Sequence, residues 1–104
     1  MKRVLLTAAL GLGLGALAVP AFADLALATS KNCMSCHAVE RKVLGPSFKD
    51  VAAKYKDDKG AADRLASKIM KGGSGVWGPV PMPANNQVSE ADAKKLAAWV
   101  LSTK

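Results

Sequence analysis

Apolar residues recur at helical spacing beyond residue 23, and no stretch alternates apolar and polar residues as a half-buried strand would. The positions that follow the spacing i, i+3, i+4 and i+7 fall into three groups: Phe48, Val51, Ala52 and Tyr55; Ala62, Leu65, Ala66 and Ile69; and Ala93, Leu96, Ala97 and Val100, with Trp99 at the edge of the last group. A further short helix is expected from Asp24 to about Asn32. The pattern therefore predicts an all-α fold of about four short helices.

Residues typical of helix ends stand beside these groups. Ser47 and Ser89 each precede an apolar group and have an aspartate three residues on, an arrangement typical of a capped helix N-terminus. Gly72-Gly73 directly follows the middle group and is expected to end that helix. No internal repeat or linker divides the chain, so we expect one domain.

The first residues predict export. A basic start at residues 1–3 is followed by an apolar run from Val4 to Val19, and Ala21-Phe22-Ala23 then supplies the small-x-small pattern that signal peptidase reads. We therefore expect residues 1–23 to be a cleaved signal peptide, residues 24–104 to be the mature domain, and the location to be the periplasm. The alternative is an uncleaved membrane anchor, but the run is shorter than the ~20 residues that a spanning helix needs. We expect no membrane insertion of the mature chain.

Size and charge limit what the mature chain does. A chain of about 80 residues buries little apolar surface, so an additional stabilising feature, a disulfide or a bound apolar cofactor, is expected. Of 15 basic and 8 acidic residues, cleavage removes Lys2 and Arg3 and leaves a balance of +5. The lysines are scattered rather than interleaved with aromatic residues, and export separates the protein from nucleic acid, so we expect no nucleic-acid partner. We expect a monomer.

Cys33-Met34-Ser35-Cys36-His37 has the spacing C-x-x-C-H, which is typical of covalent attachment of a c-type heme. Residues three apart on a helical turn face the same way, so both thiols can reach one edge of a porphyrin. His37, the only histidine, then lies where its imidazole can bind iron. The sequence therefore predicts one covalently bound heme c on Cys33 and Cys36.

Other interpretations of the two cysteines explain less. A structural zinc site needs four Cys or His ligands, and the chain has three. A thioredoxin-like C-x-x-C motif occurs beside a βαβ unit, for which there is no pattern here. A disulfide stays possible, but it closes a very small loop and leaves the adjacent histidine without a role.

A second iron ligand is expected from the segment between Gly72 and Val88, which is rich in glycine and proline. A structureless segment of this length in a small domain is usually functional, and prolines make it stiff. Met82 lies in it between Pro81 and Pro83, and a thioether is a suitable soft ligand for heme iron. Position therefore favours Met82 over Met70, which lies at the edge of a helical stripe where methionine often fills the core.

Four segments spread over the mature chain form a recognisable pattern. They are the C-x-x-C-H motif at 33–37, Gly45-Pro46, the run Asp-Val-Ala-Ala-Lys-Tyr at 50–55 and above all Gly-Val-Trp-Gly-Pro-Val-Pro-Met-Pro at 75–83. In these segments the sequence resembles the small bacterial class I cytochromes c of the cytochrome c-551/c-552 group. The resemblance implies the class I cytochrome c fold, with four short helices around the heme. It also implies that His37 and Met82 are the axial ligands of the iron.

Further roles are implied by the same resemblance. The carbonyl at Pro46 accepts a hydrogen bond from the proximal histidine, and the indole of Trp77 donates to a heme propionate. Lys68 stands where a basic residue meets a propionate. Asn85 stands where an asparagine bonds the methionine sulfur, although Pro83-Ala84 replaces a common double proline and a second asparagine follows.

The resemblance implies a monoheme electron carrier and not an enzyme. It would pass single electrons between respiratory redox partners, by outer-sphere Fe(II)/Fe(III) transfer in transient complexes. The basic balance indicates partners with acidic patches. One alternative is a heme enzyme or gas sensor with five-coordinate iron, but the mature chain's arginines, Arg41 and Arg64, both lie outside the loop expected above the heme. The other alternative is a heme-free binding module closed by a disulfide.

Overall fold

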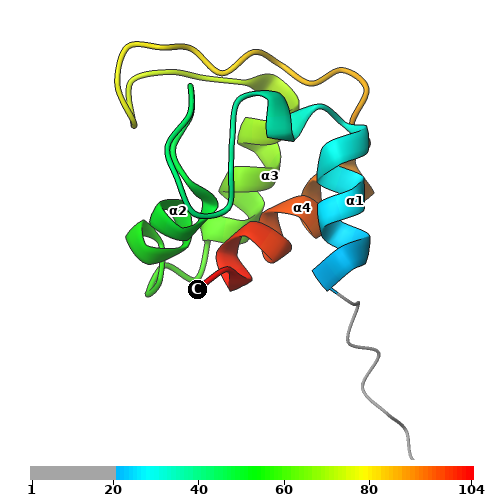
Figure 1. Cartoon of the computed structure of the whole chain (residues 1–104), viewed down its shortest axis with the longest axis horizontal. Helices are drawn as coiled ribbons and strands as arrows, with labels where there is room; N and C mark the ends of the chain where they lie inside the picture. Colours follow the sequence, from blue (N-terminus) through cyan, green and yellow to red (C-terminus); the bar gives the residue numbers. More distant parts are fainter. Residues whose placement is uncertain (1–20) are drawn as a thin grey trace, which may run out of the picture.

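The computed structural model describes residues 21–104. Residues 1–20 of the predicted signal peptide lie outside the described range. The described chain forms the α-helices α1 (Ala21–Ser30), α2 (Phe48–Lys54), α3 (Ala61–Lys71) and α4 (Glu90–Ser102), and a 3₁₀ turn, η1 (Cys33–Ser35). No strand occurs in this range, which confirms the predicted all-α fold (Figure 1). The predicted mature start, Asp24, lies in the first turn of α1.

The core forms around α4, which packs against α1, α2 and α3. Its alanines at 93 and 97 have no exposed surface, so the neighbouring helices can approach its backbone closely. The buried residues that form the core cluster are Ala28, Phe48, Val51, Ala66, Val88, Ala93, Leu96, Ala97, Trp99 and Val100. The predicted apolar face of α4 is therefore the centre of the fold.

Both predicted serine caps are confirmed. The hydroxyl of Ser47 accepts a hydrogen bond from the backbone N–H of Asp50 at 3.1 Å, and Ser89 accepts one from Asp92 at 3.1 Å. Helix α3 ends at Gly72, whose φ of 75° is a left-handed conformation that glycine adopts without strain. The sequence signals for the helix ends thus agree with the structure.

The structure adds detail at two positions of the predicted apolar stripes. Ala61, and not Ala62, is buried at the start of α3, because the helix begins at Ala61 and this residue faces the core. Trp99, which was expected at the edge of the apolar stripe of α4, is only 9% exposed and belongs to the core cluster. Its ring meets Phe48 edge to face, with 5.4 Å between ring centres, so it connects α4 to α2.

The two longest irregular segments are residues 36–47 and 72–89, and a short turn at residues 55–60 joins α2 to α3. Figure 1 shows the second of them crossing the upper end of the molecule between α3 and α4. It is closed at its base by two backbone hydrogen bonds: the N–H of Gly73 donates to Met82 at 3.0 Å, and the N–H of Met82 donates to Gly73 at 2.7 Å. Among residues 21–104 no helix is long and apolar enough to cross a bilayer.

Candidate functional site

A cavity of about 460 Å³ lies between the helices and the two irregular segments. Its lining is mostly apolar, and its volume is within the range of cofactor sites. Seven of the eight predicted site residues line it: Cys33, Cys36, His37, Pro46, Lys68, Trp77 and Met82. The fold therefore places these residues around one cavity, although Cys33 and Met82 are 49 positions apart in the sequence.

The two cysteines lie on and just after η1. Asn32 precedes the turn with a left-handed φ of 65°, and the N–H groups of Cys36 and His37 both donate to the carbonyl of Cys33, at 3.2 and 3.0 Å. This tight turn brings both cysteines to the cavity wall as free thiols. Burial raises the pKa of the Cys33 thiol above its ordinary value, whereas redox-active C-x-x-C pairs have a lowered one.

The His37 ring is held on several sides. Its Nδ1 donates to the carbonyl oxygen of Pro46 at 2.8 Å, and because a carbonyl only accepts, Nδ1 carries the proton. Nε2 is then the nitrogen with a free lone pair, which is the tautomer that a metal ligand needs. The ring also stacks on Phe48, with 5.0 Å between ring centres and 25° between planes.

Gly45 allows the chain to pass this ring closely. A Cβ at this position would lie 2.7 Å from Nδ1 of His37 and 3.0 Å from its Nε2, so a larger residue would displace the imidazole. The Gly45 N–H donates to the carbonyl of Cys36 at 2.8 Å, which folds residues 36–45 back onto the cysteine turn. The sequence alone indicated no role for Gly45 beyond its place in the Gly-Pro pair.

Met82 is positioned by its backbone. The paired hydrogen bonds with Gly73 fix it at the base of the loop, and the flanking prolines restrict the backbone on both sides. At Gly72, a Cβ would collide with the Met82 carbonyl oxygen and lie 2.8 Å from the Ala84 nitrogen. The glycine that ends α3 is therefore also what allows residues 82–84 to lie against the helix end.

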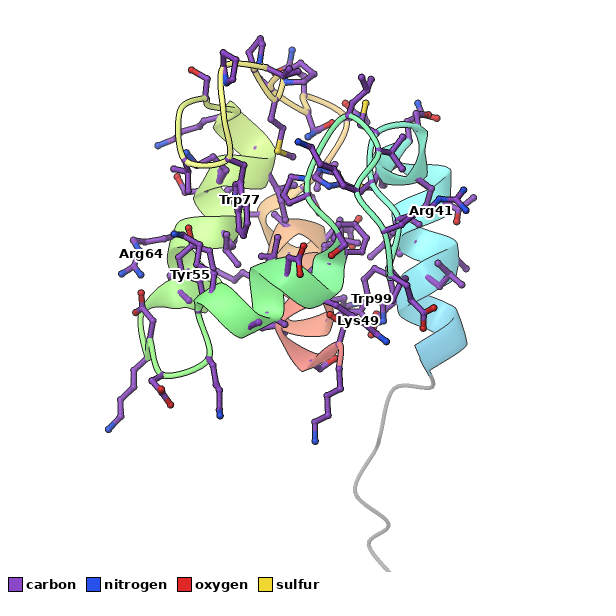
Figure 2. The ribbon with its side chains drawn as sticks, turned by 60° about the vertical axis from the view of Figure 1, so that its left-hand side comes forward. Arg41, Lys49, Tyr55, Arg64, Trp77 and Trp99 are labelled. Carbon is purple, nitrogen blue, oxygen red and sulfur yellow. The ribbon has the colours of Figure 1, made fainter. Side chains whose placement is uncertain are left out.

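Basic and aromatic groups gather at another part of the lining. Lys68 extends from α3 beneath the loop, and a Cβ on Gly73 would lie 2.6 Å from its ammonium nitrogen. A smaller hollow of about 220 Å³ continues the cavity here, with Arg64 added to its wall. Trp77 is 42% exposed, and Figure 2 shows its side chain directed from the loop toward Tyr55. Arg64 is already paired with Asp58, so the indole N–H of Trp77 and the ammonium group of Lys68 are the groups at this end that suit the binding of carboxylates.

Asn85 is the predicted site residue that does not line the cavity. Its side-chain amide donates to the carbonyl of Ile69 at 2.8 Å, and its carboxamide oxygen accepts from Gln87 at 3.2 Å. Asn85 therefore ties the loop to the end of α3. A bond from the second amide hydrogen to the Met82 sulfur stays a prediction.

Large apolar residues surround the mouth of the cavity and remain exposed. Val43 is 44%, Leu44 60%, Val76 48% and Val80 59% exposed, and all four also line the cavity. Single exposed apolar residues are ordinary, but a group around one hollow indicates that a further apolar surface belongs there. A flat porphyrin in the cavity, held by thiols and an imidazole, fits this lining.

Comparison with known proteins agrees with this geometry. The family model described as "Cytochrome c" matches residues 25–104. The chain belongs to the cytochrome c family. Cytochrome c-552 of Nitrosomonas europaea is 58% identical over 82 residues, which cover 79% of this chain and 80% of that protein. Cytochrome c-552 of Hydrogenobacter thermophilus is 53% identical over 104 residues and over the full length of both chains.

The fold is also shared with a known cytochrome. The crystal structure of wild-type Nitrosomonas europaea cytochrome c552 matches with a TM-score of 0.75 and 57% identity, over 77% of this chain and 99% of that one. The small class I cytochrome fold is thereby confirmed. As a cytochrome c, the chain carries one covalently attached heme c and is a monoheme electron carrier that works with redox protein partners.

Proposed function

We propose that this cytochrome carries electrons in the periplasm, with heme c bound through thioethers to Cys33 and Cys36 and with His37 and Met82 as the axial ligands of its iron. The observation that carries the proposal is that these four residues line one apolar cavity. When bound, the heme supplies a reversible one-electron change between Fe(II) and Fe(III). The protein's residues then determine the orientation of the heme, its reduction potential and its exposure to redox partners.

His37 acts as an oriented neutral donor. The hydrogen bond from its Nδ1 to Pro46 fixes the tautomer and makes the ring a stronger donor through Nε2. Stacking on Phe48 and the close approach of Gly45 restrict rotation of the ring. These contacts support the assignment of His37 as the proximal ligand.

Met82 would supply a soft thioether ligand to the iron from the loop between α3 and α4. A thioether favours ferrous iron and so raises the reduction potential. With both axial positions taken by the protein, no substrate or oxygen can coordinate, and no proton or bond needs to move. This is the behaviour of a carrier and not of a heme enzyme.

Trp77 and Lys68 serve the two propionates. The indole N–H donates a hydrogen bond and the ammonium balances negative charge, at the end of the cavity where both side chains lie. Together they orient the heme and lower the cost of placing its carboxylates beside the protein. Asn85 is proposed to add a hydrogen bond to the Met82 sulfur.

Export and partner choice follow from the sequence. Residues 1–23 are proposed to be removed, so that the chain begins at Asp24 in the periplasm. The mature balance of +5 would steer the exposed cavity mouth toward acidic patches on its partners. Small redox interfaces of this kind release quickly, which suits a carrier.

The heme attachment and axial ligands are tested with the purified periplasmic protein. The reduced protein should show a sharp α band that survives acid-acetone extraction, and an extractable heme would refute attachment through Cys33 and Cys36. Met82→Ala should keep the heme, lose the weak far-red band of ferric iron bound to methionine sulfur, bind carbon monoxide and have a lower potential. Met70→Ala is the matched control and should retain the band. The reverse pattern would assign the ligand to Met70.

Export and docking have separate tests. Mass spectrometry of the periplasmic protein should give a chain that begins at Asp24, and a chain that keeps residues 1–23 would refute cleavage. Electron-transfer rates to a physiological partner should fall as salt is added, because screening weakens the attraction between opposite charges. A rate independent of salt would mean that apolar contacts around the cavity mouth dominate docking.

A further inference from the structure

Lys54, the last residue of α2, lies over two aromatic rings. Its ammonium nitrogen is 5.5 Å from the centre of the Trp77 ring and 5.9 Å from the centre of the Tyr55 ring. Both distances lie within the ~6 Å at which a cation is attracted to an aromatic face. Among residues 21–104 this lysine forms no ion pair with a carboxylate, so the rings are its main protein partners.

The tip of the loop that carries Trp77 has few other attachments. The N–H of Gly75 donates to the carbonyl of Gly78 at 3.0 Å, which turns the tip upon itself. In the described chain no hydrogen bond joins residues 74–81 to the rest of the domain. The tip is therefore held by side-chain contacts alone, and Lys54 supplies one of them.

The two elements that meet at this contact are each connected to a different one of the two proposed iron ligands. Helix α2 begins with Phe48, which stacks on His37, and follows directly after Pro46, which binds the same ring. The loop ends at its base with Met82. A contact between Lys54 and Trp77 thus joins the histidine side to the methionine side.

We propose that Lys54 is a positioning residue that holds Trp77 against the end of α2 and so restrains the Met82 loop over the heme. The inference rests on the proposed axial role of Met82. When the contact is lost, the loop opens more often, and Met82 leaves the iron more often, although Lys54 touches neither group. The lysine acts through the aromatic ring and not through its charge on the heme.

The experiment measures how fast excess imidazole displaces Met82 in the ferric holoprotein, followed by the decay of the far-red band. Lys54→Gln removes the cation and keeps much of the side-chain length, whereas Lys54→Arg keeps the cation. Lys56→Gln is the matched control, because it removes the same charge from an exposed position two residues on. Lys54→Gln should accelerate displacement about two- to fivefold, as expected for an exposed cation–π contact. Lys54→Arg and Lys56→Gln should leave the rate unchanged.

A second pair of variants separates the ring contact from the charge. In a Trp77→Leu background the loop is already released, so adding Lys54→Gln should change the displacement rate no further. The inference is overturned if Lys56→Gln accelerates displacement as much as Lys54→Gln, or if Lys54→Gln retains its full effect without the indole. A wild-type protein that lacks the far-red band would instead refute the axial role of Met82, and the proposed restraint with it. An intact band with an unchanged rate in Lys54→Gln would refute only the restraint.

Discussion

The helical body and the two irregular segments of this cytochrome bury their apolar residues to very different degrees. In α4, Ala93 and Ala97 are fully buried and Leu96 is 2% exposed, whereas Leu44 and Val80 in the irregular segments are 60% and 59% exposed. The side chains of the body find their partners on other helices. The exposed apolar side chains of the irregular segments, such as Leu44 and Val80, line a cavity that is sized for a cofactor. One half of the domain is therefore completed by protein and the other half by heme.

This difference teaches how so small a domain becomes stable. A core made from about 80 residues contributes little by itself, and a large apolar cofactor adds the missing buried surface. The tip of the second irregular segment, residues 74–81, also has no backbone hydrogen bond to the helices, and its loop is closed only at the Gly73–Met82 base. Heme attachment should therefore stabilise the irregular segments more than the helices.

The largest effect is expected from preventing heme attachment. The double variant Cys33→Ala/Cys36→Ala should lose covalent heme and most of the ~5–15 kcal/mol by which such a domain is stable. In the heme-free chain, amide hydrogens of Gly73 and Met82 should exchange much faster than those of α4, as measured by hydrogen exchange. Equal protection in both regions would contradict the division into two halves.

A large loss of stability is expected when a buried side chain of the helical body is truncated. Leu96→Ala should lower the free energy of unfolding of the holoprotein by about 2–5 kcal/mol, because it opens a cavity in the core. Val80→Ala, a smaller truncation in the exposed loop, should cost less than about 1 kcal/mol. Urea unfolding measures both values. Similar costs at the two positions would mean that the loop is packed as firmly as the core.

An intermediate effect is expected where the body meets the loop. Gly72→Ala should cost about 1–3 kcal/mol for its left-handed backbone, and it should also weaken the far-red iron–methionine band because the new Cβ pushes on Met82. Gly75→Ala is the control: its φ of 93° is similarly strained, but nothing lies within 4 Å of its Cβ position. The band should therefore persist in Gly75→Ala. Its loss there as well would show that backbone strain, and not the collision, moves the methionine.

The smallest effect is expected on the solvent face of α4. Lys94 lies 3.4 Å from Glu90 one turn earlier, with both side chains largely exposed. Lys94→Ala should lower the free energy of unfolding by only about 0.2–0.5 kcal/mol, less so at high salt, and leave the reduction potential unchanged. Thermal unfolding at two salt concentrations measures the difference. A salt-independent loss would assign the effect to the lysine stem and not to its charge.

Local signals allowed much of the fold to be predicted. The apolar spacing and the capping serines located α2, α3 and α4 because both depend on neighbours within one helical turn. The cysteine motif likewise needs only five consecutive residues. In α3 the apolar stripe predicted Ala62, whereas Ala61 is the buried alanine, because the packing of the whole helix decides which alanine of its first turn is buried.

Contacts between distant segments were beyond sequence patterns. The pairing of Gly73 with Met82, the close approach of Gly45 to His37 and the position of Lys54 over Trp77 all depend on how the loops fold over the cavity. Asn85 shows the same limit, since its amide meets a helix-end carbonyl that no local pattern indicated. Resemblance to known cytochromes named several site residues and one contact between distant residues, the hydrogen bond from His37 to the Pro46 carbonyl, which is present at 2.8 Å.

The confinement of the His37 ring has a consequence for the speed of electron transfer. An electron moves quickly when the surroundings of the iron need little rearrangement between the two oxidation states, that is, when the reorganisation energy is small. The hydrogen bond to Pro46, the stacking on Phe48 and the close backbone at Gly45 leave the imidazole little freedom to turn or shift. If His37 binds the iron as proposed, a ring held in this way would keep nearly the same position before and after the electron leaves. The rigidity of residues 37–46 would then lower the barrier to electron transfer itself.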